Sequence, residues 1–121
     1  MTKIICIDFD GVIHSYKSGW KGADQIPDKP VEGAMCWLMA LLSQSDIEVA
    51  IYSSRSCQEN GIEAMQNWLA YYGMEEEYIR LIKFPKEKPP AFLTIDDRAI
   101  CFRGTFPAID EIRTFKSWIE K

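Results

Sequence analysis

The sequence predicts an α/β fold of three layers, in which helices cover both faces of a central parallel sheet. Short apolar runs rich in β-formers alternate with stretches of helical spacing, and this alternation is typical of parallel sheets. The runs are almost continuously apolar, as strands covered on both faces must be. The chain has 121 residues and no internal repeat or linker, so we expect one domain over residues 1–121.

The N-terminal half supplies two predicted strands and two predicted helices. Residues 3–8 form the first strand, and the glycine- and proline-containing residues 14–30 form a long loop. Apolar side chains recur at helical spacing over residues 31–44, and residues 47–52 form the second strand. Residues 59–72 form the second helix, because one of its faces is apolar and a glycine follows it directly.

The C-terminal half is expected to complete the sheet and the helical layers. Residues 79–84 are predicted as a third strand, residues 91–95 as a fourth and residues 100–102 as a short fifth strand. Pro107 suits the first turn of a last helix. The side chains of that helix expected to face the core are Ile109, Ile112, Phe115 and Ile119.

Composition excludes several classes of function. A net charge of -4 gives no broad basic field, so indiscriminate binding to nucleic acid or to a membrane surface is not favoured. No apolar run approaches the roughly 20 residues of a membrane helix, and the N-terminus does not resemble a signal peptide. The 4 cysteines are scattered without a C-x-x-C pair. We therefore expect free thiols and a cytoplasmic protein.

Side chains capable of chemistry follow three of the predicted strands. They are Asp8 and Asp10 after the first strand, Ser53 and Ser54 after the second, and Asp96 and Asp97 after the fourth. Ligands of such sheets bind beyond the carboxyl ends of the strands. If the first and fourth strands are neighbours, four carboxylates converge and repel one another unless a cation lies between them. Oxygen ligands alone select a hard cation, so we expect Mg²⁺.

A magnesium site of this kind predicts phosphoryl transfer. The metal attracts a phosphate, and a serine hydroxyl and a lysine ammonium can hold its other oxygens. One aspartate can attack phosphorus to give an aspartyl-phosphate, while another protonates the leaving oxygen and later activates water.

Three stretches, "IICIDFDGV", "VAIYSSRS" and "KPPAFLTIDDRA", are similar to the motifs of the haloacid dehalogenase-like (HAD) phosphatases. Their order and rough spacing match the family over essentially the whole chain. The resemblance implies a three-layer Rossmann-like (HAD-like) fold and a Mg²⁺-dependent phosphomonoester hydrolase. Strand one is then expected in the middle of the sheet, between strands two and four.

The resemblance also assigns roles to individual residues. Asp8 maps to the nucleophile and a metal ligand, and Asp10 maps to the general acid and base whose backbone carbonyl also binds Mg²⁺. Ser53 maps to the phosphate-binding hydroxyl, with Ser54 beside it as a second candidate, and we expect one of the two serines to be a helix N-terminal cap.

The lysine and the acidic pair map less uniquely. Lys88 fits the motif lysine best by its distance to the acidic pair, and Lys86 is the alternative. We expect Asp97 to bind the metal directly, because it lies further beyond the strand, and Asp96 to lie behind it.

Two other functions use similar residues. A receiver-like signalling module also carries an acidic pair, a Ser or Thr and a Lys, but its acidic pair comes early, whereas here it comes late. A catalytically idle HAD-like binding domain is the second alternative, although every catalytic position holds a competent residue.

Residues 14–30 are predicted to form a small flap instead of a large cap domain. We therefore expect a phosphorylated substrate that covers the site itself, such as a macromolecular end, or a homo-oligomer whose second subunit closes it. A small phosphorylated molecule is the other candidate substrate. Within and near the flap, we expect His14 to be a solvated loop residue or a substrate contact. We expect Trp20 to pack under the loop or to take a stacking role, and Arg55 to pair with an acidic residue.

Overall fold

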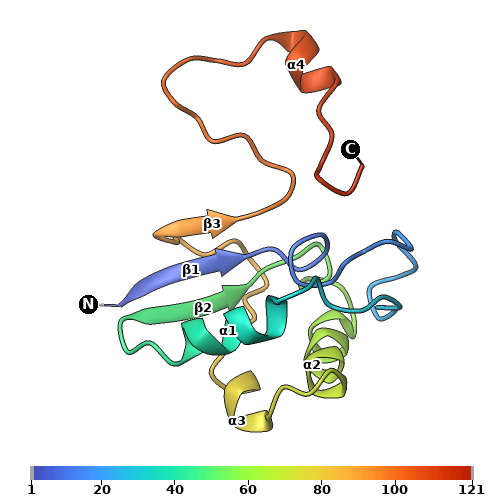
Figure 1. The fold of residues 1–121 in the computed structure, drawn as a ribbon, viewed down its shortest axis with the longest axis vertical. Coiled ribbons are helices and arrows are strands. Elements are labelled where there is room, and N and C mark those ends of the chain that lie inside the picture. The colour runs from blue at the N-terminus through green and yellow to red at the C-terminus, as the bar shows by residue number, and fades with distance from the viewer. Residues whose placement is uncertain (1, 121) are drawn as a thin grey trace.

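The computed structural model describes residues 2–120 and has an α/β fold with a three-stranded parallel sheet (Figure 1). The strands are β1 (Lys3–Ile7), β2 (Ile47–Ile51) and β3 (Leu93–Ile95), in the order β2-β1-β3. Ile7 lies opposite Ile51 on one side and Ile95 on the other. This arrangement confirms that the strand at the N-terminus is central and that the acidic pair follows its neighbour.

Four helices accompany the sheet: α1 (Ala34–Leu42), α2 (Gly61–Tyr71), α3 (Glu76–Ile79) and α4 (Ile109–Arg113). The first two lie inside the stretches predicted to be helical. Helix α1 packs against β2, and α2 buries its apolar face. Beyond the glycine at position 73, the chain turns into α3.

One apolar core joins the central strand to α1 and α2. Ile7, Phe9, Leu38 and Leu69 are fully buried within it. The ring of Phe9 meets the edge of Trp68 with the ring centroids 5.1 Å apart. Because Phe9 directly follows Asp8, the core holds the backbone of the candidate site in place.

The predicted third strand, at residues 79–84, is wrong. Ile79 ends α3, and the following residues form a turn from which only Lys83 pairs with Ala50 at the outer edge of β2. Ile79 and Ile82 are both buried, and their spacing of three suits a helical turn instead of an alternating strand. The residues therefore lie beside the sheet as predicted, in a different local conformation.

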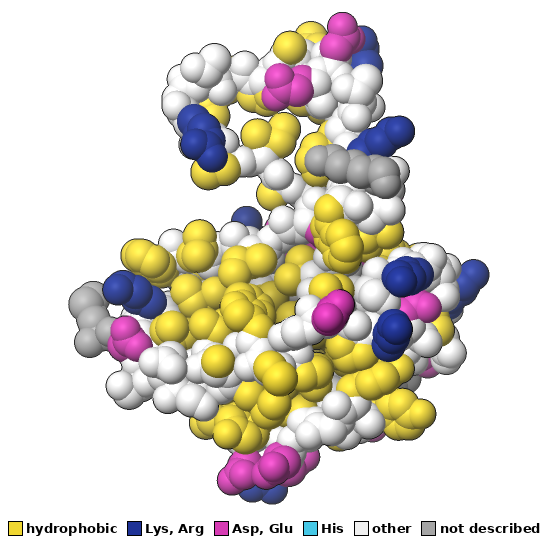
Figure 2. All heavy atoms as spheres, in the orientation of Figure 1, with side chains coloured by type: hydrophobic (Ala, Val, Ile, Leu, Met, Phe, Trp, Pro, Cys, Tyr) yellow, Lys and Arg dark blue, Asp and Glu magenta, His cyan; other side chains and the backbone are white. Residues whose placement is uncertain are grey.

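At the C-terminus the predicted last helix is present as α4, but the predicted fifth strand and the expected docking of the helix on the core are wrong. Residues 100–102 form no strand, and α4 lies away from the sheet in Figure 1. The exposed fractions of Ile109 and Ile112 are 67% and 57%, and Phe115 and Ile119 are only partly buried. A helix this short presents too little apolar surface to dock firmly. Figure 2 accordingly shows an apolar area on the sheet beside α1 that no helix covers.

Two further expectations concern the whole chain. Cys6, Cys36, Cys57 and Cys101 are all free thiols, as predicted. Among residues 2–120, no helix combines the length and the hydrophobicity needed to cross a bilayer.

Candidate functional site

Backbone hydrogen bonds bring the carboxyl ends of the three strands to the same edge of the sheet. The amide of Asp8 donates to the carbonyl of Ile95 at 2.9 Å, and the amide of Tyr52 donates to the carbonyl of Ile7 at 3.1 Å. The residues that follow each strand therefore begin side by side, which is the geometry that the sequence predicts.

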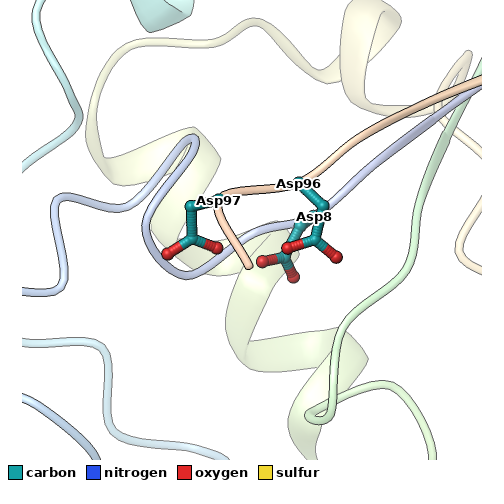
Figure 3. Close-up of side chains that lie close together, drawn as sticks. All are labelled: Asp8, Asp96 and Asp97. Carbon is teal, nitrogen blue, oxygen red and sulfur yellow. The ribbon is translucent and has the colours of Figure 1, made fainter. Parts of the chain in front are cut away.

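Three carboxylates converge at this edge. Asp8 extends from the end of β1, and Asp96 and Asp97 extend from the end of β3, with all three carboxyl groups directed to the same side (Figure 3). One oxygen from each lies within 4.8 Å of the others. This confirms the predicted convergence for three of the four aspartates.

Gly11 allows the close approach of Asp97 to the loop after β1. Its φ of +86° favours glycine, and a Cβ there would lie 2.2 Å from Oδ2 of Asp97. The other oxygen of Asp97, Oδ1, is buried and has no hydrogen-bond partner among the described residues. A buried carboxylate oxygen without a donor fits a place for a cation.

Burial and mutual repulsion disfavour the fully ionised form of the cluster. Burial, the charge of Asp96 and a hydrogen bond with Asp97 raise the pKa of Asp8 to about 8. Burial also raises the pKa of Asp97, while its hydrogen bond with Asp8 opposes that rise. The three carboxylates could hold a metal ion, and a hard divalent cation such as Mg²⁺ fits this all-oxygen donor set.

The side chain of Asp10 lies outside the acidic cluster and is held by two cationic or hydrogen-bonding partners. Nε of Arg55 donates to both oxygens of Asp10, at 3.1 and 3.0 Å. Nδ1 of His14 lies 2.9 Å from Oδ1 of the same carboxylate. The prediction that Arg55 pairs with an acidic residue is confirmed, and its partner is the candidate acid and base.

The prediction for His14 is wrong, because its side chain is fully buried instead of solvated. Its Nε2 accepts a hydrogen bond of 3.1 Å from the amide of Asp28, and its ring packs against those of Phe9 and Trp68. A single histidine in a loop has no periodicity that would predict burial. Its contacts come from parts of the chain that only the fold brings together.

Ser53 is the buried member of the serine pair, and Ser54 is exposed. Oγ of Ser53 accepts a hydrogen bond of 3.2 Å from the amide of Arg55, and its own amide donates to Oγ of Ser56 at 3.0 Å. The expectation that one of the pair caps a helix is wrong, because α2 begins at Gly61 with Asn60 at its N-cap, and the contact of Ser53 is a turn within the loop after β2. The hydroxyl hydrogen of Ser53 is not used in this contact and can still be donated to a phosphate oxygen.

The two candidate lysines differ in their surroundings, although both side chains are exposed. Burial raises the pKa of the Cys6 thiol, and the charge of Lys88 partly opposes that rise, so Lys88 lies within electrostatic range of β1. Lys86 instead lines a hollow with Ser56 and Gln58 at the start of α2. Lys88 therefore stays the first choice for the motif lysine only as a prediction, since neither lysine is among the groups that shift the pKa of Asp8 or Asp97.

Comparison of the chain with protein-family models, with curated proteins and with solved structures finds no match to any of them.

Proposed function

We propose that the protein is a Mg²⁺-dependent phosphomonoester hydrolase with the Rossmann-like fold of HAD phosphatases and no large cap. The observation that carries the proposal is the convergence of Asp8, Asp96 and Asp97 within 4.8 Å at the ends of two adjacent parallel strands. Such a cluster is costly without a cation, and a structural turn would not require it.

The metal ligands proposed are the carboxylates of Asp8 and Asp97 and the main-chain carbonyl of Asp10, with Asp96 behind them. When bound, Mg²⁺ would offset the negative charge of the carboxylates and of the substrate phosphate. The hydroxyl of Ser53 and the ammonium of Lys88 would hold the remaining phosphate oxygens. Lys86 and Ser54 are the alternatives for this binding role.

The reaction proceeds in two steps in this proposal. An oxygen of Asp8 attacks phosphorus, the ester P–O bond breaks, and the leaving oxygen takes a proton from Asp10. Water then attacks the aspartyl-phosphate and gives a proton to Asp10. The bond between phosphorus and Asp8 breaks, which releases inorganic phosphate and restores both side chains.

The surroundings of the cluster bear on the substrate. A hollow of about 610 Å³ lies between the flap and α2, lined by residues such as Pro27 and Tyr71, and none of the three carboxylates lines it. The acidic cluster is thus not the floor of that hollow. A phosphorylated macromolecular end or a small ester fits this arrangement, and a second subunit could supply further cover.

The test is hydrolysis of p-nitrophenyl phosphate and a panel of natural phosphate esters by purified protein. We expect turnover with Mg²⁺, loss of turnover on chelation and recovery when Mg²⁺ is restored. Lasting stoichiometric phosphorylation without turnover would instead indicate a receiver-like module. A folded protein that reacts with no ester at any Mg²⁺ concentration would refute the proposal and favour an idle binding domain.

A further inference from the structure

Arg55 is the largest fully buried side chain of the described residues. It belongs to none of the roles proposed above, yet one end of its guanidinium holds Asp10 through Nε, at 3.0 and 3.1 Å from the two carboxylate oxygens. Arg55, from the loop after β2, therefore orients the carboxylate of Asp10, the proposed acid and base.

The other end of the same guanidinium holds the flap, residues 14–30. Nη1 donates to the backbone carbonyls of Gly22, Ala23 and Gln25 at 2.9, 2.9 and 3.0 Å. The ring of Trp20 covers the guanidinium with its centroid 4.9 Å away, and this ring is itself 44% exposed. Of the two roles expected for Trp20, packing under the loop and stacking, the structure shows stacking, with Arg55 as the partner.

Stability alone gives a poor account of this arginine. Its Nη2 is buried and has no hydrogen-bond partner among residues 2–120, and a buried donor without a partner is destabilising. Apolar replacements of buried ion pairs are often neutral or stabilising. The two sets of bonds from one rigid, planar group instead suit a connection between the flap and Asp10.

We propose that Arg55 is a positioning residue that makes closure of the flap and orientation of the Asp10 carboxylate a single event. This inference rests on the proposed phosphatase function for its kinetic consequence, but the physical connection exists without it. His14 also orients Asp10, because its ring hydrogen-bonds both the carboxylate of Asp10 and the amide of Asp28 in the flap. A loosened flap then misplaces the acid and base, so it lowers kcat instead of merely weakening substrate binding.

The first experiment measures Trp20→Ala with p-nitrophenyl phosphate and Mg²⁺. We expect kcat to fall on the order of 10-fold or more with a smaller change in KM. Trp37→Ala is the matched control, because Trp37 is similarly exposed at 38%, lies on α1 and does not contact Arg55; we expect its kcat to stay within about twofold of wild type. A Trp20→Ala protein with raised KM and unchanged kcat would show that the flap is only a cover and would overturn the proposal.

The second experiment asks whether the guanidinium itself is needed. Lysine can pair with Asp10 but has no second arm that also reaches the flap carbonyls, so Arg55→Lys should retain only part of kcat. Free guanidinium at millimolar concentration should restore part of kcat to Arg55→Ala and none to Trp20→Ala. Full kcat in Arg55→Lys would contradict the positioning role.

The third experiment needs no catalysis, so it separates this proposal from the phosphatase proposal. Hydrogen exchange is measured at the flap amides of Gln25 and Asp28, which are hydrogen-bonded within the structure. We expect Asp10→Ala to speed their exchange severalfold and Asp96→Ala, outside the connection, to leave it unchanged. Equal exchange in both variants and wild type would overturn the connection even if the enzyme turns over, whereas faster exchange in Asp10→Ala alone would support it even if no ester reacts.

Discussion

Residues 2–95 and residues 96–120 differ in what their apolar side chains contact. In the first region Ile7, Phe9 and Leu38 are fully buried. In the second region Phe106 and Ile109 are 84% and 67% exposed, although they belong to a similarly apolar stretch. The difference shows that apolar spacing produces a core only where a sheet face or a second helix is within reach.

The two regions nevertheless meet at the candidate site. Asp96 and Asp97 begin the second region, and Nε1 of Trp118 donates a hydrogen bond of 2.7 Å to the carbonyl of Gly11. Arg98 and Glu120 form an ion pair that closes the same segment on itself. The site therefore depends on the buried region for its rigidity and on the exposed region mainly for two carboxylates.

The largest expected effect is on kcat, and it compares a carboxylate of the candidate site with an exposed carboxylate of α4. Asp8→Asn keeps the size of the side chain and removes the nucleophile, so kcat should fall by roughly 10³-fold or more. Asp110→Asn in α4 is the matched control, because that side chain is 90% exposed and, among residues 2–120, its only ion pair is with Arg113 on the same helix. Steady-state kinetics on p-nitrophenyl phosphate measure both. Substantial turnover in Asp8→Asn would refute its assignment as nucleophile.

The next effect compares burial in the two regions. Leu38→Ala should lower the free energy of unfolding by about 2–5 kcal/mol, because it leaves a cavity in the core. Ile112→Ala, at a residue that is 57% exposed, should change that free energy by less than about 0.5 kcal/mol. Urea denaturation followed by circular dichroism gives both values. A large loss for Ile112→Ala would mean that the second region is packed in solution and would break the comparison.

The dependence of stability on pH should reveal the buried Asp8. The pKa of Asp8 is about 8 in the folded protein against the usual 3.8. The protonated side chain therefore makes its full contribution to the free energy of unfolding below about pH 4. As pH rises from about 4 to about 8, the unfolded state releases this proton and the folded state does not, so stability falls.

Without metal, Asp8→Asn should therefore be more stable than wild type at pH 8. The difference in free energy of unfolding between Asp8→Asn and wild type should grow from pH 5 to pH 8 by on the order of 2 kcal/mol. One pKa unit corresponds to about 1.4 kcal/mol, and the full value is not reached because Asp8 shares its proton with Asp97. Adding Mg²⁺ should reduce this difference in stability, because the ion stabilises the charged wild-type cluster. Thermal melts at several pH values measure the difference, and a constant difference would contradict the raised pKa.

The smallest expected effect distinguishes the two aspartates where the regions join. Asp97→Asn should raise the Mg²⁺ concentration needed for half-maximal activity by about tenfold, because its Oδ1 is buried and has no partner among the described residues. Asp96→Asn should raise it less, since Asp96 is exposed and its Oδ1 accepts a hydrogen bond of 2.8 Å from the amide of Arg98. Metal titrations of activity measure both. A larger effect for Asp96→Asn would reverse the assignment.

Much of the site could be predicted because it follows directly from the ends of strands. Asp8, Ser53 and Asp96 each follow an apolar run, and parallel pairing brings the ends of adjacent strands to one edge. Residues 79–84 were predicted wrongly as a strand, because their apolar stretch is short. Buried residues three apart fit a helical turn, and in so short a stretch this spacing cannot be told from the alternation of a strand.

The sequence by itself determined that apolar strands alternate with helices and that Asp8, Asp96 and Asp97 follow two of those strands. The central place of β1, which brings the three carboxylates together, was expected from the resemblance of the motifs and not from local spacing. Hydrophobic periodicity and the position of polar residues after each strand are local properties, so they can be read along the chain. Only the tertiary structure decided that His14 and Arg55 are buried and both contact the carboxylate of Asp10, and that α4 lies away from the sheet. These outcomes depend on contacts between residues far apart in the chain, such as Arg55 with the carbonyl of Gly22. Local spacing contains no information about which distant surface will cover a side chain.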